Sequence, residues 1–157
     1  VLAKAIGGGI PAGLVAAREA FLDRWAAGTQ SSTFQFHPMA AAAGEALIDA
    51  IEEDDLFARA RAIEARFAER RHELSAFPFV CDVRGIGAMH GIEIVRDGRP
   101  DKALCDAIRR ACLQQGVITY ECGLSGHVIG LLPPLVMDDT DLDAAIDVLV
   151  NVMREVG

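Results

Sequence analysis

The sequence lacks any concentration of positive charge. It has 15 lysine and arginine residues against 23 aspartate and glutamate residues, for a formal net charge of −8. Its largest basic groupings are the pairs Arg70-Arg71 and Arg109-Arg110. Binding to a phosphate backbone needs a dense positive field. We therefore expect no nucleic-acid partner.

Long apolar runs are also missing. Charged residues, or clusters of glycine and proline, interrupt every run well before about 18 apolar residues, the length that a membrane helix needs. The pattern of a secretory signal does not occur either. We therefore expect no association with a membrane.

The four cysteines form no recognisable metal or redox motif. They include no CxxC pair, and no histidine lies near them at metal-ligand spacing. Cys105 and Cys112 are seven residues apart in a helical pattern, so we expect both to be buried as small apolar side chains. No metal site is predicted, and reduced thiols favour a cytoplasmic location.

Glycine, proline and apolar spacing predict the elements of the chain. The glycine-rich segment from Lys4 to residue 16 is expected to be a loop, and Val1 to Ala3 has the pattern of a strand whose beginning is missing. We therefore expect the chain to be a piece of a longer protein. The further elements expected are a short helix at 18–25, helices at 38–51 and 56–74, strands at 79–83 and 89–95 around a turn at 84–87, a helix at 100–115, strands at 117–121 and 127–132, and a last helix capped by residues 138–140.

The order of these elements predicts two parts. Residues 1–54 resemble a portion of a larger domain, and residues 55–157 form an α+β unit of two strands, a helix, two strands and a helix. The acidic run at 52–55 marks the boundary.

Lysine is scarce, which draws attention to Lys4. The only other lysine is Lys102, against thirteen arginines. Lys4 stands at the expected strand end, before the glycine loop. Imine chemistry needs an amine that can reach a carbonyl group held against glycine backbone. The alternative is an ordinary solvated lysine.

Four ordered segments resemble the class III aminotransferases, the family of the 4-aminobutyrate, ornithine and acetylornithine enzymes. The first resembles the segment AK-x-x-x-GG-x-P-x-G around that family's cofactor lysine, and the others follow in the family's order. The segments are Leu2-Ala3-Lys4-Ala5-Ile6-Gly7-Gly8-Gly9-Ile10-Pro11 with Gly13, Gly28-Thr29 through Ser32-Thr33-Phe34 to Pro38, Asp82-Val83-Arg84-Gly85-Ile86-Gly87 with Gly91-Ile92-Glu93, and Val128-Ile129 to Leu131-Leu132-Pro133-Pro134-Leu135.

The resemblance implies a fold and a reaction. The parent fold would be α/β, of the aspartate-aminotransferase-like fold type I. Residues 1–54 would be the C-terminal part of its large cofactor-binding domain, and residues 55–157 its small C-terminal α+β domain. The reaction would be transfer of an amino group from an amino acid or ω-amine to a 2-oxo acid, with pyridoxal 5′-phosphate as cofactor.

The resemblance also implies roles for three residues. Lys4 would hold the cofactor as a Schiff base and carry the proton during catalysis. Thr33 would donate a hydrogen bond to the cofactor phosphate from the neighbouring subunit, which implies a homodimer with its site at the subunit interface. Arg84 would grip the substrate carboxylate. The alternatives are a loop hydroxyl or helix cap for Thr33, and a structural arginine paired with a nearby carboxylate for Arg84.

The chain departs from the family at two places. Gln35-Phe36-His37 replaces the Gly-Gly-Asn that many relatives have before the proline, which would reshape the pocket wall. Gly130 stands where relatives commonly have an arginine. This difference would either alter carboxylate binding or have little effect, if the position is structural. We expect His37 to be a packing or capping residue rather than an acid or base.

Two other functions stay open at this point. A pyridoxal-phosphate aminomutase, racemase or decarboxylase of the same fold would carry the same lysine. A non-catalytic α+β interaction module would have Lys4 and Arg84 as surface residues. In the family, the phosphate loop, the stacking aromatic and the carboxylate for the ring nitrogen all precede the lysine. We therefore expect the isolated chain to bind the cofactor poorly and to be inactive.

Overall fold

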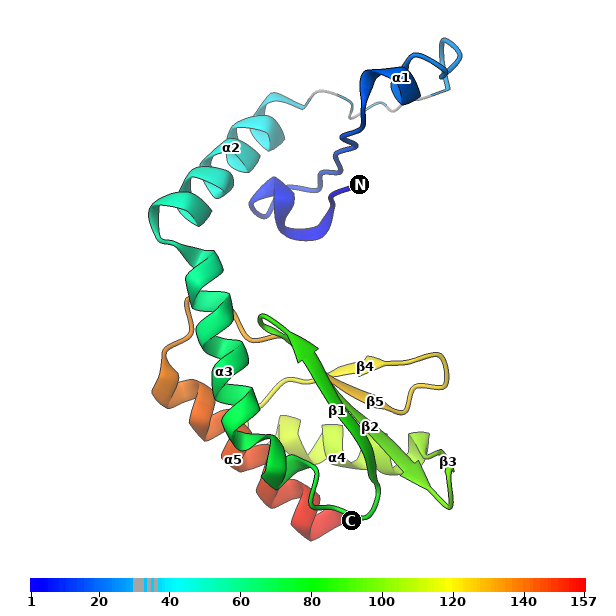
Figure 1. Cartoon of the computed structure of the whole chain (residues 1–157), viewed down its shortest axis with the longest axis vertical. Helices are drawn as coiled ribbons and strands as arrows, with labels where there is room; N and C mark the ends of the chain where they lie inside the picture. Colours follow the sequence, from blue (N-terminus) through cyan, green and yellow to red (C-terminus); the bar gives the residue numbers. More distant parts are fainter. Residues whose placement is uncertain (30–32, 34, 36) are drawn as a thin grey trace. The chain divides into compact units, whose positions relative to one another are not determined.

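A computed structural model describes residues 1–29, 33, 35 and 37–157. The chain forms two compact units, Val1–Leu56 and Phe57–Gly157, which Figure 1 colours from blue to cyan and from green to red. The division lies close to the boundary expected after residue 54. That the first unit is the end of a larger cofactor-binding domain stays a prediction.

The described residues of the first unit form three helical segments. The 3₁₀ turn η1 spans Lys4–Gly7, α1 spans Glu19–Leu22 and α2 spans Pro38–Glu53. The prediction of a loop over residues 4–16 was therefore wrong for Lys4–Gly7, where the chain makes one tight turn before the left-handed Gly8. Residues 8–16 contain no helix, as expected. Pro38 begins α2, and Nδ1 of His37 accepts a hydrogen bond from the Ala40 amide at 3.4 Å. His37 is a helix cap, as expected.

The first unit has no apolar side chain that is buried among its described residues. Gly7 and Gly44 are its only buried residues in that part of the chain. Its large apolar side chains remain at least 43% exposed at seven internal positions, which are Leu2, Leu14, Val15, Phe21, Trp25, Met39 and Ile48. Apolar surface of this extent is typical of a segment that packs against further protein.

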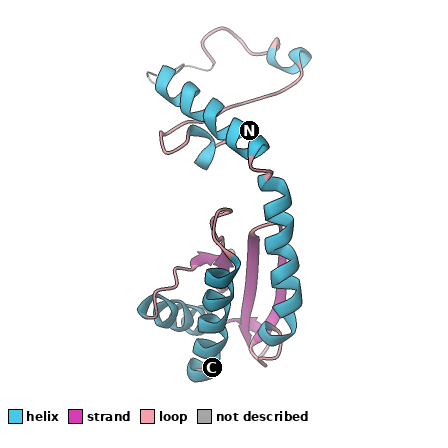
Figure 2. Cartoon of the chain, turned by 90° about the vertical axis from the view of Figure 1, so that its left-hand side faces the viewer, coloured by secondary structure: helices cyan, strands magenta, loops and turns pink. Residues whose placement is uncertain are grey.

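The second unit is built on an antiparallel sheet. Its strands β1 (Val80–Ile86), β2 (Met89–Arg96), β5 (Val128–Leu131) and β4 (Tyr120–Cys122) lie side by side in that order, and β3 (Arg99–Pro100) pairs with β2. The helices are α3 (Leu56–Leu74), α4 (Lys102–Gln114) and α5 (Asp139–Val156), which Figure 2 shows next to the strands. The two pairs of strands separated by a helix agree with the expected α+β order.

The core of this unit joins the sheet to all three helices. Ile92 and Ile129 on neighbouring strands are fully buried, as is Ile108 of α4. The periodic residues of α3 and α5 complete the core, namely Ile63, Phe67, Leu74, Leu142, Ile146, Leu149, Val150 and Met153. Cys105 and Cys112 are buried as predicted, and burial raises the pKa of each thiol to about 11.

Ion pairs run along the contact between α3 and α5. Nη1 of Arg59 lies 2.7 Å from Asp139, and Nη2 of Arg70 lies 2.6 Å from Asp147. Between these pairs, Arg66 binds both carboxylate oxygens of Asp143. Three arginines of one helix thus meet three aspartates of the other above the shared core.

The turn between β1 and β2 differs from the prediction. Residues 84–87 were expected to turn, but β1 continues through Ile86, which is paired with Met89. The turn is Gly87-Ala88, with Gly87 at φ +57°. A two-residue hairpin loop lets the ladder run to its end. Arg84 therefore lies within a strand, opposite Gly91.

Among residues 1–29, 33, 35 and 37–157, no helix is both long and apolar enough to cross a bilayer. The same residues contain no group of three or more histidine, cysteine, aspartate or glutamate side chains arranged to hold a metal ion.

Candidate functional site

Lys4 is the first residue of η1 and is exposed. Its backbone adopts φ +64°, a conformation that is uncommon for residues other than glycine. Gly8 and Gly9 follow with φ +56° and +97°. The Lys4 amine makes no hydrogen bond or ion pair with any residue that the structure describes. Lys4 thus carries, on a tightly turned backbone, an amine that has no partner in the described part of the chain.

Small residues hold this turn against α2. A Cβ at Gly44 would lie 2.8 Å from the carbonyl oxygen of Ile6, and one at Gly8 would lie 3.0 Å from the carbonyl oxygen of Ala43. The contact at Gly44 is closer than real Cβ atoms show and the one at Gly8 is unusually tight, and in both cases the nearest neighbour is a backbone oxygen. Gly8 and Gly44 therefore set the close approach that fixes the lysine turn on the helix.

Thr33 is an exposed turn residue of the first unit. Its hydroxyl makes no hydrogen bond to Lys4 or to another residue within the described ranges. Ser32, Phe34 and Phe36 of the same segment lie outside the described residues. The role of Thr33 toward the cofactor phosphate stays a prediction.

Arg84 lies on β1 of the second unit, with its side chain half exposed. Its Nη1 donates to Oδ2 of Asp82 at 2.9 Å and to Oε2 of Glu93 at 2.7 Å. These hydrogen bonds raise the pKa of the guanidinium further above its usual range. These two ion pairs are what a structural arginine would make, the alternative to a substrate role for Arg84. Nε and Nη2 have no partner in the described part of the chain, and the substrate role stays a prediction.

Glu93 joins Arg84 to a histidine that sequence reasoning did not single out. Oε1 of Glu93 lies 3.4 Å from Nε2 of His127, while its Oε2 accepts from Arg84. The hydrogen bond from Arg84 is the main reason that the pKa of Glu93 lies below its usual value. Strand alternation could have placed Asp82 beside Arg84, but the position of His127 depends on the pairing of β2 with β5.

Gly130 is buried on β5 beneath side chains of β4. A Cβ built there would lie 2.6 Å from Sγ of Cys122 and 3.3 Å from Cβ of Tyr120. These two side chains occupy the space that a side chain at position 130 would need. The packing of Cys122 and Tyr120 therefore leaves no room for the arginine that the family commonly has at this position.

Comparison with known proteins shows which family the chain resembles. The chain matches the family described as aminotransferase class-III over residues 1–153. It is 36% identical over 156 residues to a 4-aminobutyrate aminotransferase of Mycobacterium tuberculosis (strain ATCC 25618 / H37Rv), covering 98% of this chain and 35% of that protein.

Solved structures agree with the sequence comparison. A transaminase with L-ala is 30% identical, with a TM-score of 0.73, over 82% of this chain and 31% of the other. A PLP-bound aminotransferase mutant from Vibrio fluvialis is 26% identical, with a TM-score of 0.68, over 76% of this chain and 27% of the other.

The chain spans about a third of the length of the relatives that it matches. These relatives have the α/β fold of type I and belong to a family that depends on pyridoxal phosphate. The resemblance drawn from the four sequence segments is thereby confirmed, and the chain belongs to the class III aminotransferases.

Proposed function

We propose that the complete gene product containing this chain transfers an amino group from an amino acid or ω-amine to a 2-oxo acid, with pyridoxal 5′-phosphate as cofactor. The observation that carries the proposal is the family match over residues 1–153, which includes the Lys4 segment. The relative from Mycobacterium tuberculosis is named a 4-aminobutyrate aminotransferase. A donor whose amine is distant from its carboxylate is therefore our first choice of substrate.

Lys4 has the accessible amine that covalent attachment of the cofactor requires. Its amine is exposed, is free of ion pairs within the described residues, and is carried on a turn packed against α2. The cofactor, when bound, supplies an electron sink for the substrate carbon that loses a proton. Lys4 Nζ would provide the point of covalent attachment and then, as a free amine, the base that accepts and returns this proton.

Thr33 and the exposed apolar side chains of the first unit support a homodimer as part of the proposal. Thr33 makes no hydrogen bond to Lys4 or to any other residue that the structure describes, which is compatible with a hydroxyl that serves a site formed with another subunit. Leu14, Phe21 and Trp25 are at least 44% exposed and offer the apolar surface that an obligate partner would cover.

We propose a cytoplasmic location on the absence of any cysteine pairing motif.

Arg84 is our candidate for the substrate carboxylate. Asp82 and Glu93 engage only Nη1, which leaves the Nε–Nη2 edge for a bidentate contact. Under this proposal Arg84→Lys raises the KM for a carboxylate-bearing donor and leaves kcat for an amine without a carboxylate unchanged. If Arg84 is purely structural, the substitution would instead lower the activity toward both donors alike, because it would destabilise the protein.

The test of the reaction uses the complete gene product with pyridoxal phosphate, an isotopically labelled amine donor and a 2-oxo acid. We expect labelled nitrogen to appear in the amino acid formed from the 2-oxo acid, and no turnover without that acceptor. Conversion of the donor without an acceptor would instead identify an aminomutase, racemase or decarboxylase. Absence of any conversion across several donors would favour the interaction module.

A further inference from the structure

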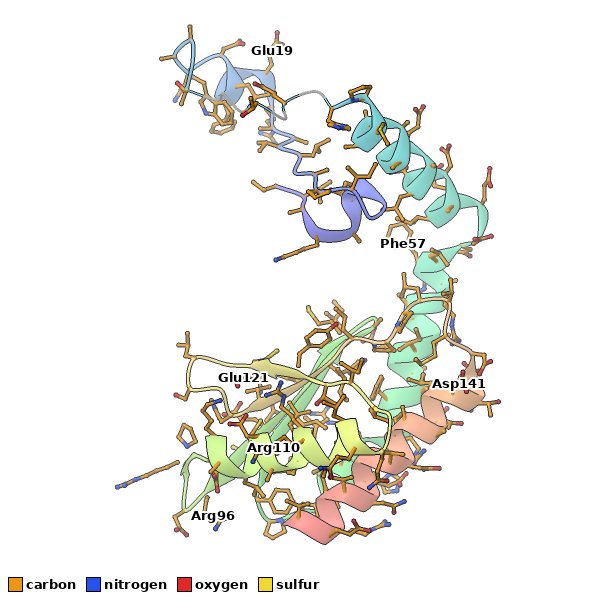
Figure 3. The ribbon with its side chains drawn as sticks, turned by 180° about the vertical axis from the view of Figure 1, so that it is seen from behind. Glu19, Phe57, Arg96, Arg110, Glu121 and Asp141 are labelled. Atoms are coloured by element: carbon orange, nitrogen blue, oxygen red, sulfur yellow. The ribbon has the colours of Figure 1, made fainter. Side chains whose placement is uncertain are left out.

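Carboxylates from two strands of the second unit hold Arg84. Its Nη1 donates to Asp82, two residues earlier on β1, and to Glu93 on the neighbouring strand β2. Asp82 and Glu93 are directly paired in the β1–β2 ladder. In Figure 3 the label Glu121 marks β4, which lies at the other edge of the sheet from β1. Like charges directly opposite each other destabilise a sheet, so the cation of Arg84 offsets a repulsion between the two strands.

Arg84 uses its guanidinium differently from two arginines of α3. Arg66 binds Asp143 through its Nε and Nη2. Arg70 binds Glu73 through the same two nitrogens. Arg84 makes both of its contacts through Nη1, and its Nε and Nη2 have no partner among the described residues. The edge of the guanidinium that suits a bidentate carboxylate is therefore occupied in the two structural arginines and free in Arg84.

Glu93 is itself held from two sides. Its Oε2 accepts from Arg84 at 2.7 Å, and its Oε1 lies 3.4 Å from Nε2 of His127. The side chain of Glu93 is 27% exposed and that of His127 is 13% exposed, against 51% for Arg84. Glu93 thus connects a half-exposed arginine to a largely buried histidine, and it can serve as a fixed anchor for that arginine.

An anchor of this kind matters because arginine has a long side chain with many rotamers. Holding the guanidinium in one orientation before a ligand arrives lowers the entropic cost of binding. Of the two carboxylates on Nη1, Asp82 is 42% exposed and also lies 3.7 Å from Nη2 of Arg71. Glu93 is less exposed and has no second arginine within the described ranges. Glu93 is therefore the firmer of the two anchors.

We infer that Glu93 is a positioning residue for the substrate carboxylate. It acts through Arg84, whose Nη1 it holds so that Nε and Nη2 can receive the carboxylate, and His127 holds Glu93 in turn. The inference rests on the proposed role of Arg84 in amino transfer and deepens it. Glu93 itself takes no chemical step and does not contact the substrate.

The test uses the complete gene product with pyridoxal phosphate and compares Glu93→Gln with Glu73→Gln. Both glutamate side chains are 27% exposed and pair with an arginine, so Glu73→Gln is a matched control. With 4-aminobutyrate as donor, we expect Glu93→Gln to raise the KM about fivefold and to leave kcat within about twofold, because a charged contact is lost but no reacting group. Glu73→Gln should leave both constants unchanged.

Butanoate carries the carboxylate without the amine, so its binding gives a reading that needs no turnover. We expect calorimetry to show a Kd for butanoate that rises by a similar factor in Glu93→Gln and stays unchanged in Glu73→Gln. Arg84→Lys should raise the KM and the Kd by itself. Adding Glu93→Gln to Arg84→Lys should raise neither constant further, since Glu93 acts through Arg84.

Failure of the inference can be told apart from failure of the role of Arg84. If Arg84→Lys raises the KM and the Kd but Glu93→Gln does not, the inference is overturned and the role of Arg84 stands. The inference is also overturned if Glu93→Gln multiplies the effect of Arg84→Lys, or if Glu73→Gln has the same effect as Glu93→Gln. If Arg84→Lys changes neither constant, or if the unmodified protein neither converts 4-aminobutyrate nor binds butanoate, the role of Arg84 fails and the inference fails with it.

Discussion

Gly130 and Cys122 face each other so closely across β5 and β4 that a Cβ on the glycine would lie 2.6 Å from the cysteine sulfur. The departure from the family's arginine at this position is therefore coupled to a second residue. Cys122 and Tyr120 fill the space, and a larger residue at 130 must displace them.

This contact predicts the effect of adding a side chain. Gly130→Ala should lower the free energy of unfolding by about 1–3 kcal/mol, the usual cost of overpacking. Cys122→Ala removes the sulfur and should reduce that cost in the double variant. A urea-denaturation cycle of the four proteins measures the coupling. Strictly additive effects would show that the sulfur does not limit position 130.

The close contact between α2 and the lysine turn predicts a second effect. Gly44→Ala favours the helix by about 1 kcal/mol in intrinsic propensity, but places a methyl group 2.8 Å from the Ile6 carbonyl. We expect the turn to be displaced and pyridoxal phosphate to be held several-fold more weakly by the complete gene product. Fluorescence titration with the cofactor measures this. Ala42→Gly, an exposed change on the same helix, should weaken the helix and leave cofactor binding intact.

His90 predicts a pH dependence. Its ring stacks on Phe67 with centroids 4.0 Å apart, and its Nε2 lies 2.9 Å from the Gly87 carbonyl oxygen. Burial lowers the pKa of His90, against the opposing effects of that hydrogen bond and of Glu64. The folded state thus favours the neutral ring. The contribution to stability is complete above the unfolded pKa of about 6.5 and is lost as the pH falls through the folded value.

The measurement for His90 is the urea midpoint of the 157-residue chain between pH 7.5 and pH 5, values chosen to bracket the ordinary histidine pKa of about 6.5. We expect the midpoint to fall across this range. His90→Phe retains an aromatic ring beside Phe67 and cannot be protonated, so its curve should be flatter. Equal slopes for the two proteins would exclude His90 as the origin of the effect.

The ion pairs between α3 and α5 predict a dependence on salt and acid. The hydrogen bond from Arg66 lowers the pKa of Asp143. A carboxylate with a lowered folded pKa stabilises the protein above its unfolded pKa of about 4, and this contribution is lost as the pH falls through the folded pKa. Asp143→Asn should therefore reduce the urea midpoint at neutral pH and low salt. The difference should shrink in about 1 M salt and in acid, because the pair is partly exposed. A difference that is constant across these conditions would point to packing instead.

Sequence reasoning succeeded where one periodicity decided the structure. Apolar residues recur at three- and four-residue steps in the helix expected at 56–74 and in the last helix, and Ile63, Phe67, Leu142 and Ile146 of these stripes are buried. Pro38 likewise predicted the start of α2. These features depend on residues a few positions apart, so local spacing is sufficient.

Sequence reasoning failed for features that depend on the pairing of strands. The glycines at 85 and 87 suggested a turn that includes Arg84, but cross-strand pairing extends β1 through Ile86. The link from Arg84 on β1 through Glu93 on β2 reaches His127, the residue before β5, and the obstruction of Gly130 by Cys122 joins β5 to β4. Such contacts depend on register between distant segments, which no local pattern gives.

The most direct measurement of the central claim is reductive trapping of the complete gene product with pyridoxal phosphate and borohydride, followed by mass analysis of its peptides. The chain supplies its own control, because Lys4 and Lys102 are its only lysines and Lys102 is paired with Glu121 at 2.6 Å. We expect the cofactor mass on the Lys4 peptide, unchanged in Lys102→Gln and absent in Lys4→Ala. An active protein whose Lys4 peptide stays unmodified would contradict the proposed role of Lys4.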